Sequence, residues 1–322
     1  MKSPVADILA LRKMPDLSAI VVVGNLRSRA QRVIDALSRQ TAKDRIEVIV
    51  VDTASPDQPP LSVDSGVICH YLRRPELEIY AQARCAGLEA ASSPVAAFIE
   101  DHCIPSAGWA QALISAHRED WAAVGYAFIN PDPDNFWCRA SMVNDYGLWL
   151  HPCTDQPVEL MPGNNISYKR DALTQFNGQL ERLLTPDYNL QQKLLAQGRR
   201  MRIEPEAKAA HQGFRSLGPA MRANFSYARL LAARRAEMQH WSMGRRIVQA
   251  ILTPPLAPLL GSIRLLRSLR GRASLAGQFM EGLPIYFLIH SWSSIGETLG
   301  YLFGEASAER DWNHFELNYD RD

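Results

Sequence analysis

Apolar runs alternate with helix-like segments along the first 130 residues of the chain. Near-continuous apolar or β-branched runs predict buried strands at residues 19–23, 46–51, 67–72 and 95–99. The segments between and after them predict helices at residues 27–39, 80–91 and 106–118, and a further apolar run covers residues 122–129. This alternation is typical of an α/β fold with a mostly parallel sheet that is covered by helices on both faces.

Polar residues stand directly at the ends of two of these runs. Asp52 ends the second run, and Glu100, Asp101 and His102 close the fourth. In an open α/β sheet, ligands bind at the carboxyl ends of the strands. Carboxylates and an imidazole can hold a divalent cation, which neutralises a phosphate-bearing leaving group. Taken alone, however, the three residues after the fourth run favour the alternative of a solvated acidic turn.

Composition limits the classes of protein to which this chain can belong. The chain has 322 residues, of which 47% are hydrophobic and 21% charged, with a net charge of +1. These values are typical of a globular protein, and the net charge indicates no particular partner. We expect no nucleic-acid partner, because there is no basic stripe with interleaved aromatic residues and no zinc-finger spacing. Five cysteines without a C-x-x-C pair predict reduced thiols in the cytoplasm, and the N-terminus shows no secretory leader.

Several familiar nucleotide and hydrolase motifs are missing from the sequence. The first strand is followed by Gly24 alone, without the G-x-G-x-x-G pattern of dinucleotide-binding proteins and without a P-loop lysine. There is also no G-x-S-x-G elbow of an α/β hydrolase. What remains is a sheet with acids at two strand ends. One acid is suited to a base or a ribose, and the other group to a metal and a diphosphate.

Short segments follow one another in a particular order along nearly the whole chain. They lie at residues 20–55, 83–87, 98–102 with Trp109, 163–170, 186–190 and 195–211. This order resembles the family 2 glycosyltransferases of GT-A fold. The resemblance implies a GT-A-type catalytic domain at residues 1–215, with a nucleotide-sugar half at about 1–105 and an acceptor half at about 106–215. It also implies inverting transfer of a sugar from a nucleoside diphosphate, expected to be a UDP-sugar, to a hydroxyl in polysaccharide or glycolipid synthesis.

The resemblance assigns the contacts to the nucleotide-sugar to four residues. Asp52 is expected at the base or ribose, Glu100 at the ribose or the metal, and Asp101 beside the diphosphate. Arg84 is expected to be a charge-assisted partner of the diphosphate, although it could instead form an ion pair with Glu89 on its own helix.

The resemblance also implies a divalent cation, Mn or Mg, beside the diphosphate. Asp101 and His102 are the expected ligands, and His211 could add a contact to the metal or the diphosphate from the far side. A structural histidine is the alternative for His211.

Asp187 matches the position of the family's catalytic base. Loss of a proton from the acceptor hydroxyl requires a carboxylate within hydrogen-bond reach. Because Asp187 follows Pro186, it could instead be an acidic residue in the first turn of a helix. Glu181 and Asp155 are the next candidates for the base.

The sequence departs from the family pattern at four positions. Glu100 and His102 replace the outer acids of the D-x-D motif, Cys85 replaces an asparagine, and Pro186 replaces a glutamate. These departures leave open an inactive nucleotide-sugar-binding protein as an alternative, and a nucleotidyltransferase is a further one. The sequence names neither the donor sugar nor the acceptor, and it leaves the oligomeric state open.

The last hundred residues differ in character from the rest. Residues 241–280 contain six arginines and no acid, and the apolar stretch at 247–263 is interrupted by Pro254, Pro255 and Pro258. We therefore expect residues 216–322 to form a helical region that lies on an anionic membrane surface, at the inner face of the cell membrane, without a conventional span. The alternatives are a helical lid on the catalytic domain and a homodimer interface.

Overall fold

The computed structural model describes residues 14–319 and holds one central mixed sheet flanked by helices. The expectation that the N-terminus lacks a secretory leader concerns residues 1–13, which lie outside the described part. The sheet order is β3-β2-β1-β4-β8-β6-β9-β5, and β7 also pairs with β9. The strands are β1 (Leu17–Val23), β2 (Ile46–Asp52), β3 (Ile68–Arg73), β4 (Val95–Glu100), β5 (Cys103–Pro105), β6 (Ala123–Ile129), β7 (Gln156–Pro157), β8 (Ile166–Lys169) and β9 (Met201–His211).

The N-terminal half of the sheet follows the sequence prediction closely. Strands β3, β2, β1 and β4 run parallel to one another. Every residue of β1, β2 and β4 is buried, which explains why these strands are mostly apolar and do not alternate. The helices of this half are α2 (Arg27–Ser38), η1 (Lys43–Arg45), α3 (Tyr80–Ala90) and α4 (Trp109–Ala116). The α/β fold expected from the sequence is confirmed.

The second half of the sheet changes direction at β8. This strand is antiparallel to both β4 and β6, and β9 is parallel to β6 but antiparallel to β5. Its connections contain α5 (Phe136–Tyr146), η2 (Gly147–Trp149), α6 (Arg170–Thr174), α7 (Leu180–Leu184) and α8 (Tyr188–Ala196). These connections bring residues 144–149 and 184–188 to one side of the sheet, where the candidate site lies.

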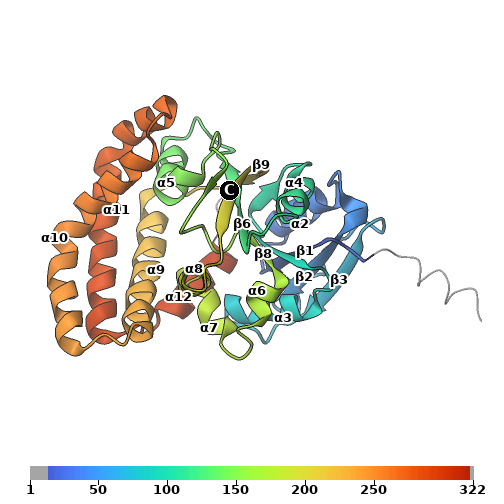
Figure 1. Ribbon diagram of the computed structural model, residues 1–322, viewed down its shortest axis with the longest axis horizontal. Coiled ribbons are helices and arrows are strands. Elements are labelled where there is room, and N and C mark those ends of the chain that lie inside the picture. Colours follow the sequence, from blue (N-terminus) through green and yellow to red (C-terminus); the bar gives the residue numbers. More distant parts are fainter. Residues whose placement is uncertain (1–13, 320–322) are drawn as a thin grey trace, which may run out of the picture.

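The chain after β9 is helical, as the sequence predicts. The helices are α9 (Leu217–Met238), α10 (Met243–Ser268), α11 (Ala273–Phe303) and α12 (Ala308–Asn318). Figure 1 shows α10 farthest from the sheet, α11 beside it, and α9 on the side of the catalytic half. Gly296 and Gly300 of α11 pack against the backbone of α9, where a side chain at either position would meet backbone oxygen atoms at 2.5 and 2.3 Å.

Helix α10 is continuous, which corrects the expectation that its prolines break the apolar segment. A proline at position 254 leaves the carbonyl of Ala250 without its helical donor. The Thr298 hydroxyl of α11 donates to this carbonyl oxygen at 3.2 Å and replaces the missing bond. Among the described helices, α10 alone is long and apolar enough to cross a membrane, and 17% of its most apolar window is buried.

Candidate active site

A buried group of one carboxylate and two imidazoles lies at the carboxyl end of β4. Glu100 ends β4, His102 lies in the turn that follows, and His211 ends β9. Because Cys103 pairs with His211 between β5 and β9, the register places the two histidines side by side. Glu100 Oε2 lies 3.0 Å from His211 Nε2 and 3.6 Å from His102 Nε2. One potential ligand atom from each residue falls within 4.8 Å of the others.

This group fits a divalent cation by its donor set and spacing. Metal–ligand bonds of about 2.1 Å at right angles put neighbouring ligand atoms about 3.0 Å apart, which matches the separation of Glu100 from His211, whereas the separation of Glu100 from His102 is wider. Imidazole nitrogens together with a carboxylate suit Mn or another transition metal better than Mg, which prefers oxygen ligands. Of the expected ligands, His102 and His211 belong to the group, and Glu100 joins them.

Asp101 lies outside this group and orients it. Its carboxylate oxygen Oδ1 lies 2.7 Å from Arg29 Nη2 and 3.1 Å from His102 Nδ1. A carboxylate on one ring nitrogen of a histidine directs the other nitrogen toward a metal. The described contacts therefore give Asp101 the role of a positioning residue for His102. The sequence analysis did not identify Arg29.

Two asparagines hold the side chain of Glu100. Asn164 Nδ2 donates to Glu100 Oε1 at 2.7 Å, and Asn165 Nδ2 donates to Glu100 Oε2 at 2.5 Å. The Asn165 side chain also accepts a hydrogen bond from the Glu100 backbone N–H at 3.0 Å. Both asparagines lie in the 163–170 segment, which is one of those that carry the family resemblance in the sequence. Their contact with Glu100 spans more than sixty residues, which no local pattern reveals.

Asp187 and Arg84 form a two-bond ion pair in the interior. Arg84 Nη1 lies 3.0 Å from Asp187 Oδ2, and Arg84 Nη2 lies 3.1 Å from Asp187 Oδ1. Arg84 also donates to the backbone oxygens of Gly163 and Leu184, and its guanidinium lies 4.2 Å from the centre of the Phe98 ring. Arg84 therefore contacts the candidate base, and the alternative pairing with Glu89 is not the one the structure shows.

Asp187 does not cap the helix that follows it. It occupies the N-cap position of α8, but its side chain makes no capping hydrogen bond. Burial raises the pKa of the Asp187 carboxyl, the Arg84 guanidinium opposes this shift, and the nearby charge of Glu100 adds to it. Gly163 packs so closely that a β-carbon there would lie 2.0 Å from Asp187 Cβ. Glu181 and Asp155, the next candidates for the base, are exposed and do not line the pocket described below.

Asp52 is buried in a network of its own at the end of β2. Both of its carboxylate oxygens accept hydrogen bonds from Arg27 at 2.9 Å, and Arg73 and the Tyr71 hydroxyl also donate to it. Burial opposes its ionisation, but the bonds from Arg27 and Tyr71 outweigh burial and hold the pKa of Asp52 below its usual value. A contact between Asp52 and a base or ribose stays a prediction. Arg27 and Arg73, which the sequence analysis did not single out, are more exposed than Asp52.

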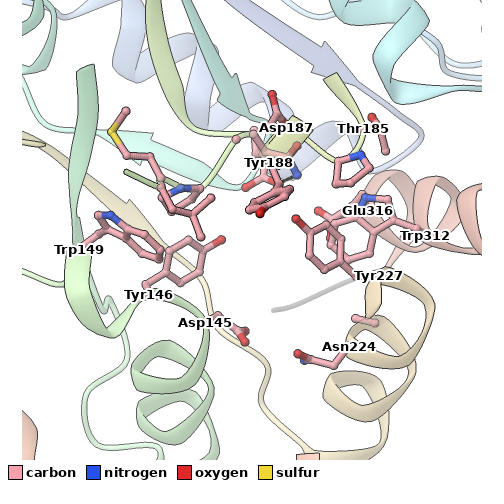
Figure 2. A pocket seen from close by; sticks show the side chains of 18 of the residues that line it. Asp145, Tyr146, Trp149, Thr185, Asp187, Tyr188, Asn224, Tyr227, Trp312 and Glu316 are labelled. Atoms are coloured by element: carbon pink, nitrogen blue, oxygen red, sulfur yellow. Dashed lines mark hydrogen bonds between the residues drawn. The ribbon is translucent and has the colours of Figure 1, made fainter. Parts of the chain in front are cut away.

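A pocket of about 350 Å³ is lined by one member of the candidate metal group and by the candidate base. Glu100 and Asp187 both line it, and Figure 2 shows Asp187 and Tyr188 on one side and Asp145 and Asn224 on the other. The C-terminal helices supply part of the wall through Asn224, Tyr227, His290, Trp312 and Glu316. No sequence pattern indicated these five residues.

Comparisons with known proteins decide the family of the catalytic half. The model of glycosyl transferase family 2 matches residues 18–175. The chain carries a family 2 glycosyltransferase domain. The resemblance found in the sequence is thereby confirmed. The matched region holds Asp52, Arg84 and the residues after β4, whereas Asp187, His211 and the C-terminal helices lie beyond it.

Two known proteins resemble this chain. A probable polypeptide N-acetylgalactosaminyltransferase 8 from Homo sapiens is 29% identical over 182 residues, which are 46% of this chain and 29% of the human protein. The chain therefore spans less than a third of the length of that relative. The mannosyltransferase PcManGT from Pyrobaculum calidifontis, solved with GDP-Man and Mn²⁺, has a TM-score of 0.53 and 16% identity. The likeness covers 91% of this chain and 86% of the archaeal one, and it confirms the GT-A fold.

Proposed function

We propose that this protein is an inverting glycosyltransferase that moves a sugar from a UDP-sugar to a hydroxyl acceptor. The observation that carries the proposal is the pocket in which Glu100, a member of the candidate metal group, and the buried carboxylate of Asp187 both take part. A cation site can stabilise a diphosphate leaving group, and a carboxylate can take the proton of the attacking hydroxyl. The family 2 domain and the glycosyltransferase relatives support the same reaction class.

These residues account for each bond and for the proton in the proposed transfer. The acceptor oxygen forms a bond to the anomeric carbon, and the bond from that carbon to the diphosphate oxygen breaks with its electron pair on the diphosphate. Asp187 takes the hydroxyl proton. Arg84 uses two of the roughly four lone-pair positions on the Asp187 carboxylate, so positions remain for the hydroxyl.

Divalent-cation dependence is part of the proposal. A cation held by Glu100, His102 and His211 would supply positive charge to the diphosphate. Asp101 orients His102, and Asn164 and Asn165 orient Glu100, so the donor atoms are held in position before any cation binds. The cation that accompanies GDP-Man in the archaeal mannosyltransferase is Mn²⁺, in line with this proposal.

We also propose that the helical region rests on an anionic membrane surface at the inner face of the cell membrane. Many large apolar side chains of α10 and α11 are exposed to solvent: Met243, Ile247, Val248, Ile251, Leu252, Leu256, Leu259, Leu260, Leu266, Met280, Phe287, Leu288, Trp292 and Ile295. Exposed apolar surface on this scale marks an interaction site. Arginines stand at both ends of α10, with Arg245 at the start and Arg264 and Arg267 near the end.

The charges on this face favour lipid over a second copy of the chain. A two-fold contact brings the same patch of each copy together. The arginines of residues 241–280 would then meet each other with no acid from this segment to compensate. Anionic headgroups complement them, at about 1 kcal/mol for each arginine near the surface. A membrane location agrees with an acceptor in polysaccharide or glycolipid synthesis.

A donor screen with the full chain tests the proposed activity. We expect one of UDP-glucose, UDP-galactose, UDP-N-acetylglucosamine or UDP-N-acetylgalactosamine to raise the melting temperature in the presence of Mn²⁺. Saturation at 100 times the dissociation constant stabilises a native protein by about 2.7 kcal/mol. The same donor should release UDP when acceptor or water attacks. If GDP-mannose alone stabilises the protein, the donor carries GDP and the proposal of a UDP-sugar is wrong. Tight binding without any release would instead indicate an inactive nucleotide-sugar-binding protein.

A further inference from the structure

The order of the strands indicates where the nucleotide of the donor should bind. The chain runs outward from β1 to β2 and β3, and it returns to β4 on the other side of β1. In open α/β sheets, ligands bind outside the carboxyl ends of the strands at such a reversal. Gly24 follows β1 there, and Glu100 of the candidate metal group ends β4. We call the place between these two residues the β1–β4 edge, and we expect the nucleotide at this edge.

The last turns of α12 lie against the β1–β4 edge. A β-carbon at Gly24 would lie 2.6 Å from the backbone oxygen of Leu317. The side-chain amide of Asn25, the next residue, donates to the side-chain oxygen of Asn318 at 3.1 Å. Leu317 is buried and belongs to the apolar core that includes Ile20 of β1. The end of α12 therefore lies where the nucleotide is expected.

Arg29 of α2 ties the same turns of α12 to the candidate metal group. Its Nη1 donates to the backbone oxygen of Tyr319 at 2.8 Å, and its Nη2 donates to the backbone oxygen of Glu316 at 2.9 Å. Carbonyl groups at the end of a helix lack helical donors, so Arg29 supplies the bonds that they need. Arg29 also forms an ion pair with Asp101, which orients His102. One buried guanidinium thus holds the end of α12 beside the metal group.

The side chain of Glu316 brings an anionic group to the same place. Its Oε2 lies 3.9 Å from His102 Nε2, and the residue is 4% exposed. Figure 2 shows Glu316 and Trp312 at the pocket, on the helix α12. Carboxylate and phosphate oxygens are both ligands for hard divalent cations. Glu316 therefore places an anionic oxygen beside the candidate metal group, where a phosphate oxygen of the donor is expected.

The first turns of α12 are held by contacts away from the β1–β4 edge. Arg234 of α9 forms an ion pair with Glu309 at 2.7 Å, and the Tyr227 ring of α9 contacts the Trp312 ring. The last turns fit less completely, because the buried amide nitrogen of Asn313 has no hydrogen-bond partner among the described residues. An unsatisfied buried donor raises the free energy of the closed arrangement. The last turns can therefore leave the edge while the first turns stay on α9.

We infer that residues 313–319 are an autoinhibitory segment that occupies the nucleotide site until the donor displaces it, with Glu316 in the place of a phosphate group. This inference rests on the proposed function and adds the regulation of its donor site. Donor and segment compete for one place. The apparent affinity for the donor is therefore the intrinsic affinity multiplied by the fraction of molecules in which the segment has left.

A reversible cross-link that holds the segment in place tests the competition. Asn25→Cys and Asn318→Cys are combined in the full chain and joined with a short bifunctional methanethiosulfonate, which a reductant cleaves. Binding of UDP and of GDP, each with Mn²⁺, is measured by calorimetry before and after reduction. The parent protein with the same reagent controls for Cys69, Cys85 and Cys153, which are partly exposed. Asn25→Cys alone, capped with methyl methanethiosulfonate, controls for the reagent at the edge.

We expect the cross-linked form to bind nucleotide at least about tenfold more weakly than its own reduced form, because the closed population then exceeds about 90%. Both controls should bind like their reduced forms. Equal nucleotide affinity before and after reduction would overturn the inference, because the nucleotide would then bind with the segment in place.

Glu316→Gln tests the role of the carboxylate. Glutamine keeps the shape but loses the charge, so the segment should leave more readily and nucleotide affinity should rise about fivefold, which corresponds to about 1 kcal/mol. Asp311→Asn is the matched control, because Asp311 is exposed on the same helix. Weaker nucleotide binding by Glu316→Gln would overturn the inference and make Glu316 part of the donor site. Transfer is scored separately. Tighter binding without transfer would refute the proposed function alone, and transfer that the cross-link leaves unchanged would refute the inference alone.

Discussion

Arg84 of α3 and Asp187 at the start of α8 face each other through two parallel hydrogen bonds in the protein interior. Their side chains are 1% and 6% exposed, so water screens the pair very little. The pair joins the helix of the nucleotide-binding half to the segment that carries the candidate base. Because a buried charge without its partner is strongly destabilising, each residue requires the other.

Arg84→Lys should weaken both stability and the ionisation of Asp187. Lysine keeps the charge but cannot donate two parallel bonds and also reach the Gly163 and Leu184 oxygens. We expect the free energy of unfolding in urea to fall by about 1–3 kcal/mol. With fewer hydrogen bonds to its ionised carboxylate, the pKa of Asp187 should rise further, so the acidic limb of the pH–rate profile should move to higher pH. The matched control is Arg182→Lys, whose exposed pair with Glu237 contributes at most about 1 kcal/mol. An unmoved acidic limb would argue against Asp187 as the titrating base.

Chelation should remove activity, and Mn²⁺ should restore it. His102→Ala and His211→Ala each remove an imidazole from the candidate metal group and should weaken Mn²⁺ binding at least tenfold in calorimetry. Asp101→Asn keeps a similar shape but weakens the orientation of His102, for which a loss of about 10–100-fold in affinity is typical. His314→Ala, at an exposed histidine outside the group, is the control. Full activity in chelator, with no metal in the purified protein, would refute a metal-dependent mechanism.

The nucleotide-binding half could be predicted from the sequence because its determinants are local. Strands β1, β2 and β4 are mostly apolar runs, β2 and β4 end in the acids Asp52 and Glu100, and such runs are visible without any tertiary information. The contacts of the site are different. Asn165 with Glu100 and Arg84 with Asp187 join residues 65 and 103 positions apart. The resemblance to a family supplied Asp187 as a candidate, but only the fold shows that Arg84 is its partner.

The helical region shows the limit of composition as a guide. Its arginines and broken apolar pattern indicated helices and a surface role, but a proline inside a segment normally predicts a break. Helix α10 nevertheless continues through its prolines, and Thr298 of another helix satisfies the carbonyl that Pro254 leaves open. No local pattern contains that contact, and none reveals that Tyr227 and Trp312 line the catalytic pocket.

Anionic vesicles should bind the full chain through the exposed face of α10 and α11. The triple change Arg264→Glu, Arg267→Glu and Arg270→Glu should release it, as measured by vesicle sedimentation, because three attractions become repulsions. The same change of charge at three exposed arginines elsewhere, Arg39, Arg74 and Arg118, is the control. High salt should weaken the electrostatic part of binding. If the parent protein ignores anionic vesicles, the lid or dimer alternatives replace membrane contact.

His117 should make the fold sensitive to mild acid. Burial, with a smaller contribution from Lys169, lowers the pKa of His117 to about 3. Its ordinary value is near 6.5, so between these values the unfolded chain binds a proton that the native protein excludes. Stability is therefore fully present above pH 6.5 and falls as the pH falls, by up to about 1.4 kcal/mol per pH unit. Urea unfolding at pH 7 and pH 5 measures this loss. His117→Gln should show a shallower dependence, and an identical slope would exclude His117 as the cause.

Asp187→Asn tests the central claim most directly, with transfer rate and donor affinity measured on the same protein. Asparagine keeps the shape of the side chain but cannot take the acceptor proton. We expect the transfer rate to fall by about 10²–10⁴. Donor affinity should stay near that of the parent. In the control Glu181→Gln, the transfer rate and the donor affinity should both stay near the parent values. Circular dichroism and thermal unfolding would establish that the variant is folded. Transfer at the parent rate by folded Asp187→Asn would contradict the assignment of Asp187 as the general base.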